Sequence, residues 1–401
     1  MPARQAHRVK HISDEQRRQR MAVRHGLHPD HRFADPASAT RGMTVLHATE
    51  AATVHLSLRA RVRDLSIGDV ETALYDTREL VKQLAMRRTL FVFPRAALPA
   101  AWGSASARVA ASEFRRLAAD VAKAGVSVSG SDWVEAAAAA VVHHLRDGDE
   151  LDAATLRREV PALDTRIVYG SGRWAQVAPV GPRVLTLLGA RGQLVRGRNG
   201  GGWRVSRPRW TAMASWLGEL VDPVDEAAGY ADLVRSWLWT FGPGTETDLA
   251  WWLGATKTAV RTALAGVQAV PVALDSGDVG WVLPGDDVDV RDEGPWAALL
   301  PTLDPTTMGW KQRGFYLDEA DVRYLFDSAG NAGTTAWWRG RVVGCWVQDA
   351  AGVVRVLPRR NPGRLALAAL RDEAERLTEW LDSDVVSSIY SSPQMRGETL
   401  P

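Results

Sequence analysis

The feature of this sequence that most restricts its fold is a run of predicted elements between residues 230 and 283. They read helix, helix, helix, strand and strand, over residues 230–241, 245–253, 256–264, 269–274 and 279–283. Gly-Pro-Gly at 242–244 ends the first helix, and Ser-Gly-Asp at 276–278 turns the chain between the strands. A helix–turn–helix followed by a β-hairpin is the pattern of a winged helix, and the helix at 256–264 would be its recognition helix. For contacts with DNA bases, this helix offers Lys257 and Arg261 but little else.

The beginning of the chain repeats this order. Helices are predicted over residues 14–25, 37–46 and 67–80, and a strand over residues 88–93. The strand is β-branched and aromatic, and Pro94 ends it. We therefore expect a flexible basic tail at residues 1–12 and a first winged-helix unit at residues 13–101.

A second unit is expected at residues 102–222 and ends in an arginine-rich hairpin. Helices are predicted at residues 102–123, 131–144, 152–160 and 182–191, and strands at 193–198 and 203–207. Near this hairpin the chain carries several arginines and no acid: Arg191, Arg196, Arg198, Arg204 and Arg207, followed by Arg209. Clustered arginines on a wing suit contacts with DNA phosphates. The alternative is a solvated hairpin in a chain with a general bias towards arginine.

The remaining chain completes the predicted architecture. Residues 223–290 hold the third winged-helix unit, and residues 291–401 a β-rich domain with strands at 335–339, 342–348 and 353–357 and a closing helix at 365–381. The fold class is therefore α+β, with about three tandem winged-helix units and a small antiparallel C-terminal domain around a DNA-binding cleft. A length of 401 residues fits two to four domains.

Bulk properties exclude several classes of protein. The net charge is only +2, so a nucleic-acid surface must be local. The single cysteine, Cys345, excludes an intramolecular disulfide, and no Cys/His cluster has zinc spacing, so no metal and no cofactor are expected. No apolar run approaches the roughly 18 residues of a membrane helix, and the N-terminus lacks a signal sequence. We expect a cytoplasmic, nucleoid-associated protein.

The candidate site lies in residues 41–63, RGMTVLHATEAATVHLSLRARVR. His47, Thr49 and Glu50 form a polar trio between two apolar runs, which predicts a loop held at the edge of a core. Arg59 and Arg61 follow as candidate DNA contacts. The alternative is an ordinary helix–loop–helix with incidental polar residues, because HATE matches no general catalytic motif.

This stretch resembles the N-terminal signature of the winged-helix superfamily that contains the AlkZ and YcaQ DNA glycosylases. Members typically read L-x-A-x-Q-A-Q-D or L-x-A-x-Q-A-D here, followed by a run like xLxLWAR. The chain reads LHATE at residues 46–50 and LSLRAR at residues 56–61. His47 thus takes the place of the first Gln, Thr49 that of the second Gln or Asp, and Glu50 that of the acid after it. Neither Gln is present.

Further segments carry the same resemblance, which covers about residues 13–380. Residues 241–254, FGPGTETDLAWWLG, are similar to the family's F-G-P-x-T-x-x-D-x-A-W-W-x-G. Residues 299–304, LLPTLD, resemble LLPAFDPY and keep its Asp-Pro at Asp304, and a GN…GR block begins at residue 330. Where relatives read RGTLHL, Phe91 stands in place of their His.

The resemblance implies a DNA glycosylase that hydrolyses the N-glycosidic bond of alkylated purines, with unhooking of interstrand crosslinks in some members. A cationic N7-alkylated base leaves without protonation, so the site needs a positioned water and groups that stabilise an oxocarbenium sugar. We expect His47 to act as a weak general base and Thr49 to orient the water. Glu50 would stabilise the sugar cation, with Asp304 from the far side of the cleft. No covalent nucleophile is evident, so the reaction would be monofunctional.

Two other classes of protein stay open. One is a non-catalytic winged-helix DNA-binding protein or transcriptional regulator, although the sequence shows no dimerisation segment and a poor recognition helix. The other is a small-molecule binder whose 17 tryptophans line a pocket. Adjacent pairs such as Trp251-Trp252 and Trp337-Trp338 argue for one ring in the core and one at the surface. The expected partner is damaged double-stranded DNA, bound by a monomer that does not associate with membranes.

Overall fold

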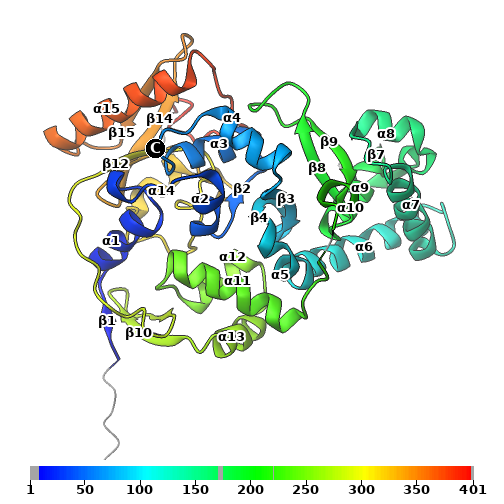
Figure 1. Cartoon of the computed structure of the whole chain (residues 1–401), viewed down its shortest axis with the longest axis horizontal. Helices are drawn as coiled ribbons and strands as arrows, with labels where there is room; N and C mark the ends of the chain where they lie inside the picture. Colours follow the sequence, from blue (N-terminus) through cyan, green and yellow to red (C-terminus); the bar gives the residue numbers. More distant parts are fainter. Residues whose placement is uncertain (1–8, 170–174, 220, 399–401) are drawn as a thin grey trace, which may run out of the picture. The chain divides into compact units, whose positions relative to one another are not determined.

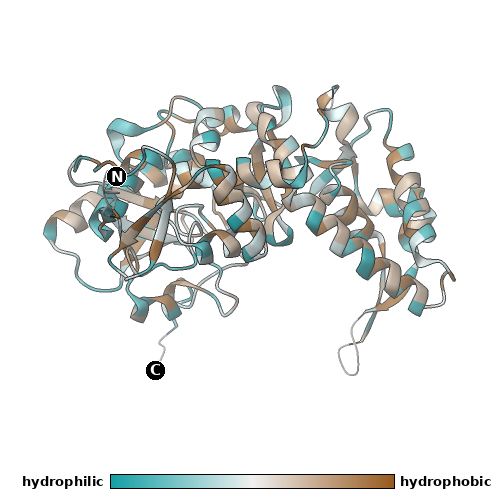
Figure 2. Cartoon of the chain, turned by 90° about the horizontal axis from the view of Figure 1, so that it is seen from below, coloured by the Kyte–Doolittle hydropathy of each residue, from teal (hydrophilic) through white to brown (hydrophobic). Residues whose placement is uncertain are grey.

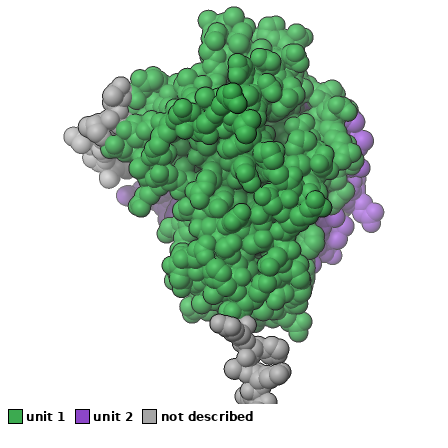
Figure 3. Space-filling model, turned by 90° about the vertical axis from the view of Figure 1, so that its left-hand side faces the viewer, with its two compact units in different colours: residues 1–47, 53–70, 231–401 green, residues 48–52, 71–230 purple. Residues whose placement is uncertain are grey.

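The computed structural model describes residues 9–169, 175–219 and 221–398. The chain divides into two compact units (Figure 3): unit 1 holds Met1–His47, Thr53–Val70 and Ala231–Pro401, and unit 2 holds Ala48–Ala52 and Glu71–Tyr230. Each unit is therefore assembled from segments that are distant in the sequence. The five-part division expected from the sequence is finer than this and stays a prediction.

Unit 1 begins with helices and a short strand (Figure 1). They are α1 (Asp14–Arg24), α2 (Pro36–Gly42), β2 (Leu46–His47), most of α3 (Ala51–Arg59) and α4 (Ile67–Glu71). Ser13 caps α1 by accepting a hydrogen bond from the amide of Gln16, and the acids Asp14 and Glu15 stand in its first turn. Hydrophilic and hydrophobic residues are interleaved along the helices of the chain, as expected for helices with one buried face (Figure 2).

Two of the predicted N-terminal helices were too long. The helix expected at 37–46 ends at Gly42, and the helix expected at 67–80 gives way to a π-helical turn at Thr72–Asp76. Each chain segment then passes through a non-glycine residue with positive φ, Thr44 at 65° and Arg78 at 57°. A left-handed residue cannot continue a right-handed helix, and both segments enter strands that the sequence pattern did not reveal.

The helix–turn–helix with its hairpin is confirmed in the C-terminal half. Its elements are α11 (Glu226–Phe241), α12 (Glu246–Leu253), α13 (Lys257–Gly266), β10 (Val270–Leu274) and β11 (Val279–Val282). A reciprocal capping box between Thr245 and Asp248 begins α12, and Thr256 caps α13. The flexible tail expected at residues 1–12 is shorter than predicted, because His11–Ile12 forms β1 and pairs in parallel with β10. Residues 1–8 of that tail lie outside the described residues.

The three strands predicted in the C-terminal region are confirmed as an antiparallel sheet, with an additional first strand. It runs β12 (Ala297–Leu300), β13 (Thr335–Trp338), β14 (Arg341–Gln348) and β15 (Val354–Pro358), in that order and antiparallel throughout. The closing helix α15 (Arg364–Leu381) packs on β12 and β15, and α14 (Glu319–Leu325) precedes β13.

Several tryptophans of unit 1 pack with other aromatic rings in its core. Trp310 contacts the rings of Phe241 and Phe315 edge to face, with centroids 5.1 and 5.0 Å apart, and Tyr316 stacks on Trp337 at 5.1 Å. In both adjacent pairs one ring is buried and its neighbour is half-buried, as the sequence indicated. No helix in the described part of the chain is long and apolar enough to cross a bilayer.

Unit 2 combines helices with small antiparallel sheets. Its strands are β3 (Leu80–Ala85), β4 (Thr89–Pro94), β5 (Leu151–Asp152), β6 (Arg166–Tyr169), β7 (Gln176–Pro179), β8 (Leu194–Asn199) and β9 (Pro208–Ala212). Its helices are α5 (Leu98–Gly103), α6 (Ala105–Lys123), α7 (Gly130–His144), α8 (Ala153–Glu159), α9 (Gly181–Ala190) and α10 (Met213–Leu217). Gly130 begins α7 against α6, where an added Cβ would lie 2.0 Å from the carbonyl oxygen of Ala118.

The arginine-rich hairpin is present, but its second strand was misplaced. We expected that strand at residues 203–207, whereas β9 spans Pro208–Ala212 and pairs with β8 through Leu194 opposite Ala212. The last three residues of β9, Trp210, Thr211 and Ala212, are all buried, as expected for the middle strand of the β5–β9–β8 sheet. Residues 200–207 therefore form an extended loop, which carries Arg204 and Arg207.

Candidate active site

The polar trio lies in the loop that joins β2 to α3. His47 ends β2 and is only 5% exposed, while Thr49 and Glu50 are half-buried in the bend before α3. Glu50 therefore stands at the N-terminus of a helix, where the helix dipole stabilises its negative charge. His47 belongs to unit 1, and Thr49 and Glu50 belong to unit 2.

Unit 2 holds this loop by backbone hydrogen bonds on either side of Thr49. The amide of Ala48 donates to the carbonyl of Leu90 on β4 at 3.0 Å. The Ser206 hydroxyl accepts from the amide of Ala51 at 3.1 Å and donates to the carbonyl of Thr49 at 3.3 Å. Ser206 thus links the loop to the arginine-rich hairpin. Sequence reasoning missed it, because nothing marks one serine in a loop that pairs with a segment 155 residues away.

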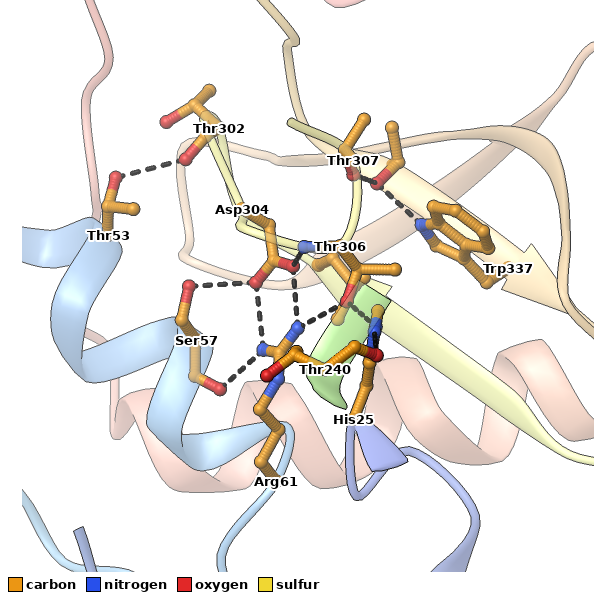
Figure 4. Close-up of polar contacts among 12 residues, drawn as sticks. His25, Thr53, Ser57, Arg61, Thr240, Thr302, Asp304, Thr306, Thr307 and Trp337 are labelled. Carbon is orange, nitrogen blue, oxygen red and sulfur yellow. Dashed lines mark hydrogen bonds and ion pairs between the residues drawn. The ribbon is translucent and has the colours of Figure 1, made fainter. Parts of the chain in front are cut away.

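Asp304 lies in a closed ion-pair network inside unit 1 (Figure 4). Its carboxylate accepts hydrogen bonds from the Arg61 guanidinium at 2.7 and 2.9 Å and from the Ser57 hydroxyl at 2.8 Å. It also accepts from the amide of Thr306 at 2.9 Å. Asp304 and Arg61 are both completely buried. The two terminal nitrogens of Arg61 and both carboxylate oxygens of Asp304 are hydrogen-bonded, so this network ties α3 to the segment around residue 304.

His25, which the sequence analysis did not single out, extends the same network. Its Nδ1 lies 2.8 Å from the Thr306 hydroxyl, and its Nε2 lies 3.2 Å from the carbonyl oxygen of Thr240. Complete burial, reinforced by the positive charge of Arg61, lowers the pKa of His25 well below its ordinary value. The contacts fit a neutral imidazole that donates from Nε2 and accepts at Nδ1.

Two arginines proposed as DNA contacts belong to the core of unit 1. Arg59 is 8% exposed and forms an ion pair with the buried Glu373, which also accepts two hydrogen bonds from Arg376 at 2.6 and 2.9 Å. Arg61 has no exposed surface, because Asp304 and Thr306 take up its guanidinium. Neither side chain presents a cation to solvent, so we correct the sequence-based interpretation and leave both out of the DNA surface.

The arginines of the hairpin differ in their partners. Arg191 forms a bidentate pair with Glu135 at 2.8 and 2.7 Å, and Arg198 pairs with Glu71 at 3.1 Å and Asp76 at 2.6 Å. In the 200–207 loop, Arg204 and Arg207 are exposed. Arg196 stacks on the ring of Trp210 at 4.9 Å. In unit 1, α13 exposes Lys257, and Arg261 pairs with Glu246 at 3.0 Å.

The model of the AlkZ-like DNA glycosylase family matches residues 40–380 of this chain. The chain belongs to the family of AlkZ-like DNA glycosylases. Among solved structures, it is similar to the DNA glycosylase AlkZ of Streptomyces sahachiroi, with a TM-score of 0.73 and 20% sequence identity over 94% of this chain and 98% of that one. At this identity the likeness shows a shared fold. No curated protein sequence matches the chain.

Membership of this family makes the chain a DNA glycosylase that acts on DNA. The matched range includes His47, Thr49, Glu50 and Asp304. Phe91, at the place of the relatives' His, is 1% exposed on β4 and contacts Phe93 edge to face at 6.3 Å. That position is therefore occupied by apolar packing. Among the described residues, no group of three or more His, Cys, Asp or Glu side chains could hold a metal ion.

Proposed function

We propose that this AlkZ-like glycosylase is monofunctional and hydrolyses the N-glycosidic bond of purines alkylated at N7 in double-stranded DNA. The observation that most supports this is the loop at residues 47–50, whose backbone is held at Ala48 and Ala51 while Thr49 and Glu50 keep exposed surface. Such a loop fixes polar groups before the substrate arrives, which is what stabilisation of a transition state requires.

In the proposed reaction, the cationic base departs and leaves an oxocarbenium-like sugar. His47 accepts a proton from the attacking water, Thr49 orients that water through its hydroxyl, and Glu50 stabilises the positive charge on the sugar. The three side chains lie within four residues of one another in the sequence. The base carries its own leaving-group activation, so no strong acid is required.

We assign Asp304 a positioning role rather than contact with the sugar. Along α3 and just beyond it, Thr53 donates to the carbonyl of Thr302 at 3.1 Å, while Ser57 and Arg61 bind Asp304 (Figure 4). The segment at 302–304 therefore holds one side of the helix that begins directly after Glu50. This gives the Asp of the family-like LLPTLD run a role without exposing its carboxylate.

A lyase step would require a lysine that forms a Schiff base with the sugar, and Lys82 is the candidate that its pKa suggests. Burial lowers the pKa of Lys82 to about 7, the range of lysines that form Schiff bases. However, Lys82 lies inside unit 2, is 7% exposed, and donates to the Tyr75 hydroxyl at 2.6 Å. Its amine is thus engaged by Tyr75 inside unit 2, and the reaction we propose is hydrolysis without a lyase step.

The DNA surface that we propose is centred on the 200–207 loop. Arg204 and Arg207 are exposed there, and Ser206 between them bonds the candidate catalytic loop. Phosphate contacts by these arginines would place damaged duplex DNA beside Thr49 and Glu50. We propose a monomer that acts on chromosomal DNA in the cytoplasm, with unhooking of interstrand crosslinks as a second use of the same bond cleavage.

One observation favours a second candidate, a winged-helix protein that binds DNA without cutting it. His47, Thr49 and Phe91 replace the family's two Gln and its His, so three polar positions of the signature differ in this chain. In that case the arginine-rich hairpin would still bind duplex DNA. The loop at residues 47–50 would contact the DNA without excising a base.

The deciding experiment uses duplexes that carry either N7-methylguanine or a nitrogen-mustard-type interstrand crosslink. After incubation, hot alkali cleaves any abasic site. We expect cleavage by the wild type, and a fall of about 100-fold or more in His47→Ala, since general base catalysis contributes about that much. His144→Ala is the matched control, because His144 is a partly exposed histidine that pairs with Glu159 outside the loop at residues 47–50.

Each result decides between the candidates. Cleavage that persists in His47→Ala would remove His47 from the mechanism. Intact duplex binding by the wild type with no cleavage of either substrate would favour the non-catalytic protein.

A further inference from the structure

An open groove of about 790 Å³ lies within unit 2, and none of residues 47–50 lines it. Its walls come from α6, α9 and the strands β3, β6, β7 and β8. Its polar lining consists of Arg88, Glu113, Arg116, Asp120, Arg183 and Arg196, with Tyr169 and Thr186 beside them. Four arginines against two carboxylates leave an excess of two positive charges. A partly enclosed wall with a net positive charge attracts anions.

The carboxylates neutralise only part of this charge. The buried Glu113 is shared by Arg88 at 3.3 Å and Arg116 at 3.8 Å, and both guanidinium groups are largely exposed. Arg183 pairs with Asp120 at 2.6 Å. A carboxylate shared between two exposed arginines leaves donors of both free to bind a further anion.

Arg196 forms no ion pair with either carboxylate of the groove, Glu113 or Asp120. Its guanidinium stacks on Trp210 at 4.9 Å, and within the described part of unit 2 no carboxylate lies within ion-pair distance of it. Burial lowers the pKa of Arg196, so the protein bears a desolvation cost to keep the charge there. A half-buried, stacked and unpaired guanidinium is suited to a planar or tetrahedral oxyanion that enters from the groove.

An aromatic ring stands at the rim of the same groove. The half-buried Tyr169 ends β6, donates from its hydroxyl to the carbonyl of Pro179 at 3.3 Å, and lies 5.4 Å from the Arg183 guanidinium. A ring held in place beside a cation is the arrangement on which unpaired bases stack in proteins that bind single strands. A duplex keeps its bases inside, so this rim favours a strand whose bases are free.

We propose that this groove binds a single nucleic-acid strand, with Arg196 and Arg183 holding its phosphates and Tyr169 stacking on an unpaired base. The volume suits a small ligand or a few linked nucleotides rather than a duplex. Arg196 lies on β8, the strand that leads into the loop bonded to Thr49. The groove would thus hold single-stranded DNA next to a lesion, and this use in repair rests on the proposed glycosylase function.

The test measures binding of a fluorescent, undamaged single strand of about twelve nucleotides to the full chain over a series of salt concentrations. In Arg183→Gln/Arg196→Gln we expect affinity to fall about tenfold or more, and the slope of log K against log salt to shrink by about 1.4, at about 0.7 for each phosphate that the protein no longer neutralises. The matched control is Arg157→Gln/Arg158→Gln, which removes the same charge from α8, where both arginines are exposed outside the groove. An equal loss in both variants, or none in the groove variant, would overturn the proposal.

A competition experiment distinguishes a nucleic-acid strand from a free nucleotide or phosphate as the ligand of the groove. Unlabelled oligonucleotide should displace the labelled strand, and millimolar AMP or inorganic phosphate should not. Displacement by micromolar AMP would overturn the strand assignment. Because undamaged DNA is used, the result does not depend on base excision, so failure of the proposed function leaves this binding result intact.

A folding control keeps the test decisive. If circular dichroism shows that Arg183→Gln/Arg196→Gln is unfolded, Arg88→Gln/Arg116→Gln replaces it, because both side chains are largely exposed. The same tenfold loss is then expected, and unchanged binding in that variant would overturn the proposal.

Discussion

At the scale of single residues, burial separates arginines that the sequence cannot distinguish. Arg59 and Arg61 are ion-paired inside unit 1, Arg204 and Arg207 are exposed, and Arg196 is half-buried against an indole. All were equivalent cations in the sequence. A guanidinium contributes to DNA binding only where it has surface to offer, and to stability only where a carboxylate matches its charge.

The Arg61–Asp304 pair leads to a prediction about stability. Asp304→Asn should lower the free energy of unfolding by about 3–5 kcal/mol, because it leaves a completely buried guanidinium without its counter-charge. Arg61→Met/Asp304→Leu should be less destabilising than Asp304→Asn, since it removes both charges. Thermal melts of the three proteins test this, and a double variant that melts below Asp304→Asn would contradict it.

At the scale of elements, the 200–207 loop and the β2–α3 loop act together through one hydroxyl. Ser206 bonds the backbone on both sides of Glu50, so an element proposed for DNA contact holds an element proposed for catalysis. The β8–β9 register explains why the contact exists. With β9 at Pro208–Ala212, residue 206 falls in the loop rather than in a strand.

We predict that Ser206→Ala lowers kcat for base excision by about tenfold while KM changes little. Two hydrogen bonds of roughly 0.5–1.5 kcal/mol each are removed from a positioned loop, and the phosphate-binding arginines stay in place. Ser206→Thr keeps the hydroxyl and should restore most of the rate. A rise in KM at unchanged kcat would instead make Ser206 a substrate-binding residue.

At the scale of the whole molecule, each unit is assembled from separate stretches of chain, and buried polar groups join those stretches. In unit 1, His25 connects the end of α1 to Thr306 and Thr240, which are more than 200 residues away in sequence. A titratable group in such a place makes the stability of the unit depend on pH.

His25 sets the direction of that dependence. Its folded pKa lies well below its unfolded value of about 6.5, so below pH 6.5 the unfolded state binds more protons than the folded state. The stability contributed by neutral His25 is present above pH 6.5 and is lost as the pH falls towards the folded pKa. Melting temperatures between about pH 5 and 8 should therefore fall on the acid side, and fall less in His25→Gln. His144→Gln, at a partly exposed histidine, should keep the wild-type dependence, and identical curves for wild type and His25→Gln would refute the assignment.

Local chemistry of the sequence determined much of the secondary structure. The helices expected to begin at residues 14, 245 and 256 begin within one residue of those positions, and each is capped by a side chain. The helix–turn–helix with its hairpin followed from periodicity and turn residues. The family-like residues 46–50 and 241–254 also identified a DNA glycosylase, because such signatures are contiguous in sequence. These features depend on neighbours a few residues apart, which a sequence displays directly.

Only the tertiary structure decided which polar groups are buried, and with what partners. Left-handed Thr44 and Arg78 end helices that the pattern would continue, because strand pairing outweighs helix propensity there. Ser206, His25 and the groove around Arg196 left no mark in the sequence. Their partners come from other elements, and the free energy of a charge or a hydroxyl depends on the neighbours that folding brings to it.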